Sequence, residues 1–320
     1  MPAAETVECW MGSRPKIQLI IFGDSWCHGN GSVRAWPELL GERLGWRTLN
    51  VAIPGSDSRM LKQQCDILLN VMKRRELEVH EDAWVLVHTG GNDILSNHPH
   101  QIFRMVWAAI SRLLCCGLPF CSGPMPIIDQ VAHNVQALLS RLHTTLGIKN
   151  AILVGMPLTA SLPMVEHTVR LLLGDNACVG ATGAYILRQI NAVHIAELRK
   201  MRPDCSQHTY QGGMGLEPPA SNARAADFKV VCLDEAAAVD AITAAEPSEH
   251  EGELVGLGSY DALWQDPVHP SQLCHEALSN VFVERFRQEL EQNHSGHTGR
   301  ESTEASRLTR PILSKVLATR

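Results

Sequence analysis

A serine placed directly after an apolar run is the first residue of this chain that could act as a nucleophile. Residues 17–22 (IQLIIF) are typical of a buried strand, and Gly23, Asp24 and Ser25 follow them. Glycine permits a tight backbone turn that a side chain would block, so Ser25 could stand at the strand end and face a cleft. The alternative is a helix N-cap, because Ser and Asp commonly begin a helix after such a turn. Taken alone, the segment favours the cap.

A glycine follows the second apolar run. Pro54, Gly55 and Ser56 come after residues 49–53 (LNVAI). A glycine at this point can present its backbone N–H to an anion without steric obstruction. An ordinary strand-to-helix turn explains the same residues and, taken alone, explains them better.

An asparagine follows the third apolar run. Gly90, Gly91, Asn92 and Asp93 come after residues 83–88. The Asn92 side chain could donate a hydrogen bond to a developing oxyanion, and it brings no charge of its own. A Gly-Gly turn with an Asx cap explains the segment equally well.

A carboxylate and an imidazole lie three residues apart near the end of the chain. Asp266 and His269 are separated by Pro267 and Val268, and Pro270 follows, so the segment is held out of a helix interior. In a single turn, Asp266 can accept a hydrogen bond from one ring nitrogen while the other takes a proton from a hydroxyl. A turn with an N-cap is the alternative. Together, the four segments supply a nucleophile, a base, an orienting acid and oxyanion donors.

Other residues could take the roles of acid and base. Asp24 and Asp93 are alternative acids, and His28 is an alternative base. Asp24 adjoins the serine, so we expect it to pin the turn through backbone hydrogen bonds. We expect Asp93 to brace the asparagine loop, and His28 to lie at the surface or in a cap, since its closeness in sequence to the serine makes proton transfer awkward.

These residues need a scaffold that brings strand ends together. Five apolar runs predict parallel strands that are covered on both faces: residues 17–22, 49–53, 83–89, 151–156 and 228–233. Helical patterns lie between and after them: residues 35–45, 58–75, 129–146, 180–202 and 271–292. The alternation predicts an α/β fold with three layers, α/β/α, around a doubly wound sheet of about five parallel strands. In such sheets the chemistry gathers beyond the carboxyl ends of the strands.

Composition excludes several classes of protein. The chain has 320 residues, of which 45% are apolar, enough for one large α/β domain or two small ones. The net charge of −6 without a basic cluster, and only 5% aromatic residues, argue against nucleic-acid binding. No signal peptide and no apolar run of ~20 residues is visible, so we expect a cytoplasmic protein without a transmembrane segment, although peripheral membrane contact stays open. Its ten cysteines are expected to be thiols, and Cys115, Cys116 and Cys121 lack C-x-x-C spacing. We expect no metal and no cofactor.

Several segments break the alternation. We expect residues 1–14 to be an N-terminal extension and residues 15–292 to form the catalytic domain. Within that domain, residues 96–126 are a Cys-, Leu- and Pro-rich insertion, and residues 205–226 look like a mobile excursion. Residues 293–320 lose the pattern and are expected to be disordered.

Together, the four segments resemble the SGNH (GDSL-type) hydrolases, whose name comes from Ser, Gly, Asn and His in separate blocks. The first block is matched by residues 23–25, the second by Gly55, the third by residues 90–93, and the last by Asp266 and His269. Any single block is common, but all four in this order are specific.

The resemblance implies a flavodoxin-like sheet and ester hydrolysis through an acyl-serine. Ser25 would be the nucleophile, His269 the general base, and Asp266 the acid that orients the histidine. The oxyanion donors would be the backbone N–H groups of Ser25 and Gly55 and the side chain of Asn92. Gly23, Asp24, Gly90, Gly91 and Asp93 would support the turns. The same triad could serve an acyltransferase, and a non-catalytic binding protein on this scaffold is a further alternative.

The substrate is the least determined feature. Trp26 replaces the leucine of the GDSL name, which puts substrate preference in doubt more than mechanism, and we expect Trp26, Ser56 and Trp264 to line the substrate. The family includes lipases, lysophospholipases, thioesterases, arylesterases and carbohydrate deacetylases. Residues 102–120 are apolar and could form a lid or acyl-binding wall, which would favour a lipid or acyl ester, or simply an extra packed helix.

Overall fold

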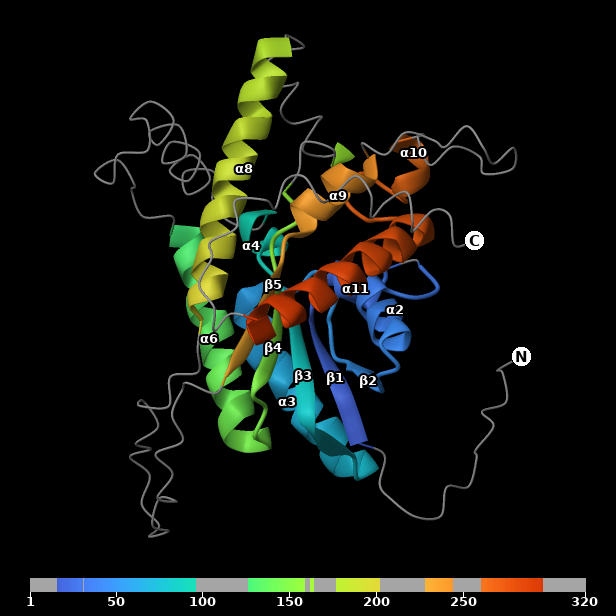
Figure 1. Ribbon diagram of the computed structural model, residues 1–320, viewed down its shortest axis with the longest axis vertical. Helices are drawn as coiled ribbons and strands as arrows, with labels where there is room; N and C mark the ends of the chain where they lie inside the picture. Colours follow the sequence, from blue (N-terminus) through green and yellow to red (C-terminus); the bar gives the residue numbers. More distant parts are fainter. Residues whose placement is uncertain are drawn as a thin grey trace.

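Five parallel strands form one sheet in the order β2-β1-β3-β4-β5 (Figure 1). The computed structural model describes residues 16–30, 32–95, 126–158, 162–163, 177–201, 228–243 and 260–295. The strands of this part are β1 (Lys16–Gly23), β2 (Thr48–Asn50), β3 (Glu78–His88), β4 (Asn150–Val154) and β5 (Lys229–Leu233). The order is flavodoxin-like, because the chain winds one way from β1 to β2 and the other way from β3 onward. The predicted fold class is confirmed.

Helices cover both faces of the sheet. The helical elements of the described ranges are α1 (Ser25–His28), α2 (Trp36–Arg43), the 3-10 turn η1 (Ser58–Met60), α3 (Leu61–Arg75), α4 (Gly91–Leu95), α6 (Pro126–Leu146), α8 (Ala177–Lys200), α9 (Glu235–Thr243), α10 (Tyr260–Leu263) and α11 (Gln272–Ser295). In Figure 1, α3, α6 and α8 lie on one side of the strands, and α2, α9 and α11 lie on the other. The arrangement is the predicted three-layer sandwich.

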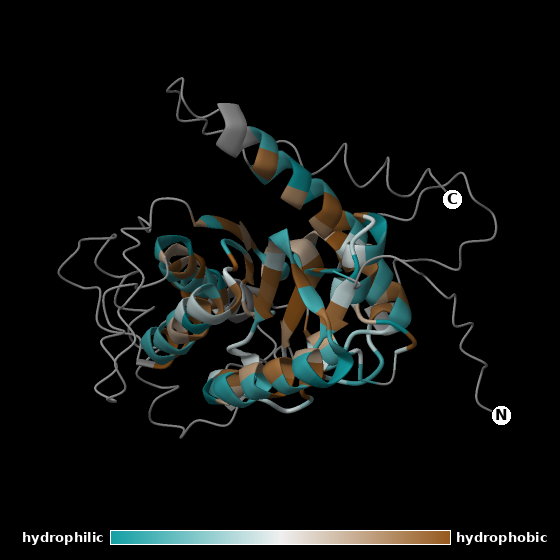
Figure 2. Ribbon diagram, turned by 90° about the horizontal axis from the view of Figure 1, so that it is seen from below, coloured by the Kyte–Doolittle hydropathy of each residue, from teal (hydrophilic) through white to brown (hydrophobic). Residues whose placement is uncertain are grey.

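Strand side chains alternate between two apolar cores. In β1, Ile20 and Phe22 pack into the core beneath α3, α6 and α8, whereas Leu19 and Ile21 pack into the core beneath α2, α9 and α11. This alternation follows from the two-residue period of a strand. Figure 2 shows the apolar strands enclosed between helices that turn polar residues outward. A parallel sheet buried in this way needs strands that are apolar on both faces, which is the pattern in the sequence.

Several predicted elements differ at their ends; β3, for example, begins at Glu78 rather than at residue 83. The strand expected at residues 49–53 ends at Asn50, although the N–H groups of Val51 and Ile53 still donate to β1 carbonyls at 2.9 and 3.0 Å. The helix expected at residues 58–75 begins with η1, because the Asp57 side chain accepts the Arg59 N–H and caps that turn.

Most of the segments expected to break the alternation cannot be compared. Residues 1–15, 96–125 and 202–227 lie outside the described residues, and so does the tail from residue 296 onward. Helix α11 extends to Ser295, three residues into the segment that we expected to be disordered.

The register of the sheet brings three loops together. Gly23 pairs with His88 across β1 and β3, and Ile21 pairs with Asn50 across β1 and β2. The loops that follow β1, β2 and β3 therefore start side by side. They meet where the strand order reverses, which is where ligands bind in doubly wound sheets.

Candidate active site

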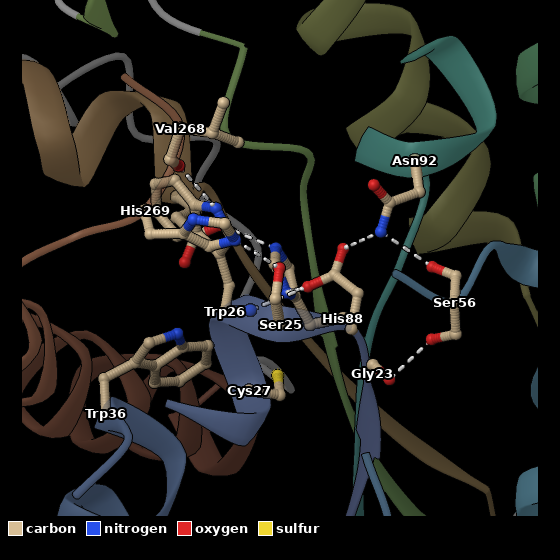
Figure 3. A network of polar contacts seen from close by, with 12 residues as sticks. Gly23, Ser25, Trp26, Cys27, Trp36, Ser56, His88, Asn92, Val268 and His269 are labelled. Atoms are coloured by element: carbon tan, nitrogen blue, oxygen red, sulfur yellow. Dashed lines mark hydrogen bonds and ion pairs between the residues drawn. The ribbon is translucent and has the colours of Figure 1, made fainter. Parts of the chain in front are cut away.

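Ser25 begins the short helix α1 directly after β1. Asp24 caps this helix, because its Oδ1 accepts the Trp26 backbone N–H at 3.0 Å, and Gly29 ends it in the left-handed conformation. The N-cap that we considered as an alternative to a nucleophile is therefore present, but Asp24 provides it. Ser25 is 8% exposed, and its Oγ faces His269 (Figure 3).

Close packing fixes the turn before the serine. A Cβ on Gly23 would lie 2.7 Å from Cys27 Sγ and 2.8 Å from the His88 carbonyl, so a side chain does not fit. The Gly23 carbonyl accepts hydrogen bonds from Ser56 Oγ at 2.9 Å and Gln64 Nε2 at 2.8 Å. Its N–H donates to Gln64 Oε1 at 3.0 Å. Glycine is needed here because other segments of the same chain, at Cys27 and His88, approach position 23 so closely.

The loop between α10 and α11 carries Asp266 and His269. Asp266 Oδ2 lies 2.7 Å from His269 Nδ1, and Asp266 Oδ1 accepts the backbone N–H groups of Val268 and His269 at 2.8 Å each. His269 Nε2 lies 3.0 Å from Ser25 Oγ. A carboxylate at Nδ1 assigns the ring proton to that nitrogen, which leaves Nε2 to accept a proton from the serine.

Hydrogen bonds keep Asp266 ionised. Burial acts to raise the pKa of Asp266, but the Val268 N–H and the ring and N–H of His269 outweigh it and lower the pKa below its ordinary value. A carboxylate in this state stabilises a positive charge on the neighbouring imidazole.

Two tryptophans tie the Asp-His loop to α1. Trp26 Nε1 donates to the Val268 carbonyl at 3.1 Å (Figure 3). The ring of Trp264 meets the ring of Trp26 edge-on, with 5.9 Å between the ring centroids. Trp26 is 3% exposed and Trp264 is 8% exposed. That the two side chains line the substrate stays a prediction, since Ser25 itself is only 8% exposed. Both pack against protein, and Trp26 holds the loop that carries His269.

Asn92 lies in the first turn of α4. Gly90, just before this helix, adopts φ +115°, and a Cβ there would lie 2.8 Å from Met156 Cγ. Asn92 Nδ2 donates to the Ser56 carbonyl at 2.9 Å and lies 3.5 Å from Asp24 Oδ2 (Figure 3). Since both partners are acceptors, the amide presents its nitrogen to the nucleophile turn.

Gly55 forms the turn after β2 with φ +75°. A Cβ there would meet open space, so glycine is required by the backbone conformation alone. Among the residues that the structure describes, none accepts the backbone N–H of Gly55 or of Ser25. The neighbouring Ser56 is 2% exposed and donates its hydroxyl to the Gly23 carbonyl, so it links two turns. Its expected contact with substrate stays a prediction.

Asp93 contacts the loop after β2. Its Oδ2 accepts the Ser58 N–H at 2.8 Å, and its Oδ1 accepts the Ser58 hydroxyl at 2.6 Å. Asn134 Nδ2 in α6 donates to the same hydroxyl at 2.8 Å. These contacts fit the bracing role expected for Asp93. The carboxylate that meets His269 is Asp266, and the alternative base His28 is exposed in the last turn of α1.

Sequence reasoning missed three buried polar residues behind the nucleophile turn. These are Gln64, His88 and Glu235, each 0% exposed. A signal was available for His88, because it is a titratable residue inside an otherwise apolar run. No pattern links it to Glu235, which follows 147 positions later at the end of β5.

The described ranges hold neither a cluster of metal ligands nor a membrane-spanning helix. No three His, Cys, Asp or Glu side chains of these ranges are grouped so that they could hold a metal ion. In the same part of the chain, no helix is both long and apolar enough to cross a membrane.

The solved structures that resemble this chain share little of its sequence. The psychrotrophic esterase EstA from Pseudoalteromonas sp. shares 12% identity at a TM-score of 0.39, with 86% of this chain and 99% of that chain covered. A candidate GDSL-like lipase from Parabacteroides merdae shares 14% identity at a TM-score of 0.43, with 85% and 97% covered. Neither similarity carries a conclusion about substrate. The comparison with curated proteins found no match.

The family comparison covers most of the chain. Residues 21–277 match the profile of the GDSL-like lipase/acylhydrolase family, and this range contains all four segments of the site. The family is one of enzymes that hydrolyse esters. With Ser25, Gly55, Asn92 and His269 all inside the matched range, the chain belongs to the GDSL-like lipase/acylhydrolase family.

Proposed function

We propose that this protein is a serine esterase that hydrolyses carboxylic esters through an acyl-serine intermediate. Family membership supports ester hydrolysis in general. The observation that carries the specific proposal is a chain of two contacts, 3.0 Å from Ser25 Oγ to His269 Nε2 and 2.7 Å from His269 Nδ1 to Asp266 Oδ2. A serine is a poor nucleophile at its own pKa, and it needs an adjacent base that is oriented by a third group.

Acylation begins at Ser25. His269 Nε2 takes the hydroxyl proton while Ser25 Oγ forms a bond to the acyl carbon, and the carbonyl oxygen becomes an oxyanion. When the oxyanion collapses, the bond to the alcohol breaks, and His269 gives its proton to the leaving oxygen. Asp266 stays ionised and stabilises the imidazolium between these two transfers.

Three donors are proposed for the oxyanion. The backbone N–H groups of Ser25 and Gly55 have no acceptor among the described residues, and Asn92 Nδ2 lies at the same turn. The 3.5 Å contact from Asn92 to Asp24 is long for a hydrogen bond, so the oxyanion can replace it at small cost. Donors that the fold holds in place in this way need little reorganisation during the reaction.

Deacylation repeats the same steps with water. His269 takes a proton from water, the hydroxide adds to the acyl carbon, and the second oxyanion uses the same donors. The bond to Ser25 then breaks, and His269 returns the proton to Ser25 Oγ. The products are a carboxylic acid and the restored enzyme.

Turnover of p-nitrophenyl esters of rising acyl chain length tests the proposal. We expect the wild type to release acid and alcohol, and Ser25→Ala to lose about 10⁴-fold or more of kcat. Ser279→Ala removes a serine that is also buried but lies in α11 and contacts Arg43, so it should keep wild-type turnover. A fully active Ser25→Ala would refute the assignment. Transfer of the acyl group to an added alcohol in place of water would change the proposed activity to that of an acyltransferase.

A further inference from the structure

Three ionisable side chains are buried directly behind the nucleophile turn. Asp24 caps α1, His88 ends β3, and Glu235 begins α9, so each comes from a different element. Their exposed fractions are 4%, 0% and 0%. Buried ionisable groups are rare unless they are paired, so a cluster of three beside a reacting serine calls for an explanation.

His88 lies between the two carboxylates. Its Nε2 is 2.6 Å from Glu235 Oε2, and its Nδ1 is 3.6 Å from Asp24 Oδ1. Both contacts are ion pairs that lack full hydrogen-bond geometry. Burial alone would lower the pKa of His88, but Glu235 first, then Cys27 and Asp24, raise the pKa well above its ordinary value. Burial raises the pKa of Asp24 and of Glu235, and the charge on His88 acts to lower both. The contacts of 2.6 and 3.6 Å place the His88 ring between two carboxyl groups, an arrangement that favours a protonated ring paired with carboxylates.

None of the described groups packed around His88 brings a second cation. On α1, burial raises the pKa of the Cys27 thiol to about 11, so the thiol is neutral. The rings of Trp26 and Trp36 each lie 6.2 Å from the His88 ring (Figure 3). Burial, with a smaller effect from the charge on His88, lowers the pKa of His194 in α8 to about 3, so that second buried histidine is neutral.

Asp24 connects this cluster to the catalytic residues. Its Oδ1 accepts the Trp26 N–H at the start of α1, where Ser25 lies, and it also faces His88. Its Oδ2 lies 3.5 Å from Asn92 Nδ2. Without a cation at position 88, a buried Asp24 would protonate or turn, and both the first turn of α1 and the Asn92 amide would shift.

We propose that His88 is a positioning residue: held between Glu235 and Asp24, it fixes the Asp24 carboxylate that orients Ser25 and Asn92. His88 touches neither the substrate nor the reacting atoms. The inference rests on the proposed function, because it assigns the cluster to the roles proposed for Ser25 and Asn92.

The test compares His88→Gln and Glu235→Gln with the control His194→Gln. His194 is also a fully buried histidine, but its Nδ1 accepts the Met156 N–H instead of meeting a carboxylate. We expect His88→Gln to lower kcat per active site by about 10- to 100-fold, with KM within about twofold, because small misplacements of catalytic groups cost that much. Active sites are counted by labelling to completion with a fluorophosphonate, so loss of folded protein does not enter kcat. His194→Gln should keep the wild-type kcat.

The pH profile separates positioning from a merely structural role. Glu235→Gln keeps the size of the side chain and an acceptor oxygen but removes the charge that holds the His88 proton. The alkaline limb of kcat should therefore move to lower pH in this variant and stay in place in His194→Gln. If His88→Gln does not fold, the kcat and the pH profile of Glu235→Gln alone test the inference.

Wild-type kcat and an unmoved alkaline limb in Glu235→Gln would overturn the inference, as would a His88→Gln that matches His194→Gln. That result would leave the proposed function intact, provided that the wild type is labelled and Ser25→Ala is not. Absence of labelling in the folded wild type would refute the proposed function instead.

Discussion

Asp266→Asn should abolish catalysis while leaving the loop intact. In the wild type, Asp266 Oδ1 accepts two backbone N–H groups at 2.8 Å, and Oδ2 faces His269 Nδ1 at 2.7 Å. An asparagine must keep its oxygen toward the two N–H donors, since its NH₂ group would be repelled there. The new NH₂ therefore faces His269 Nδ1 and donates to it. The ring proton moves to Nε2, which can no longer accept from Ser25 at 3.0 Å.

The magnitude follows from this wrong tautomer and from the lost charge. In a Ser-His-Asp triad on an unrelated fold, the same exchange lowers kcat about 10⁴-fold with the geometry intact. At 1.36 kcal/mol for each factor of ten, this corresponds to about 5 kcal/mol of transition-state stabilisation. KM should change little, because Asp266 is not proposed to touch the substrate.

Steady-state ester hydrolysis and thermal unfolding measure the two halves of the prediction. Asp66→Asn is the control, because Asp66 pairs with Arg141 on the surface of α3 and α6. Both variants should unfold near the wild-type temperature, and only Asp266→Asn should lose turnover. An Asp266→Asn variant that kept more than about 1% of kcat would refute the tautomer argument, because the expected loss is about 100-fold larger.

Three further perturbations follow from individual contacts. Asn92→Ala should lower kcat by about 100- to 1000-fold without unfolding, as expected for one oxyanion donor; wild-type turnover would remove Asn92 from that role. Trp26→Phe leaves the Val268 carbonyl without its 3.1 Å donor, so the free energy of unfolding in urea should fall by about 1–3 kcal/mol and kcat should also fall. An unchanged urea midpoint and an unchanged kcat would show that this hydrogen bond does not hold the loop. His194 has a pKa lowered to about 3 by burial, so the folded state cannot bind the proton that the unfolded chain binds below its ordinary pKa of 6.5. The stability that the neutral His194 contributes is fully present above pH 6.5, and the free energy of unfolding falls by about 1.4 kcal/mol per pH unit as the pH drops toward 3. In urea titrations over that range, His194→Gln should lack this dependence of the free energy of unfolding on pH. Equal pH dependence in both proteins would show that His194 is not the group responsible.

The sheet could be predicted because its strands are buried on both faces. A run such as residues 17–22 has no polar face, and only a covered parallel sheet accommodates it. The long helices were also visible, since α6 repeats its apolar positions over 21 residues. Helices α1 and α4 were missed because four and five residues are too few to show a 3.6-residue period. The order and spacing of four short segments indicated which residues meet at the carboxyl end of the sheet.

Contacts between distant side chains could not be predicted. The sequence does not show that the indole N–H of Trp26 donates to the Val268 carbonyl, 242 positions away. The sequence places His88 in a strand but does not show its partner Glu235. Glu235 follows β5, and only the pairing of β5 with β4 in the folded sheet brings it near His88. Such contacts form only in the tertiary structure, so local sequence patterns do not predict them.

The central claim is that Ser25 is a nucleophile activated by His269 and held in place by Asp266. Its most direct test is mass spectrometry of the protein after reaction with a fluorophosphonate, with the adduct mapped to a single peptide. The account predicts one phosphonyl group per chain on Ser25, with no adduct in Ser25→Ala and a greatly slowed reaction in His269→Ala. An adduct on another residue, or equal labelling of wild type and Ser25→Ala, would contradict the claim.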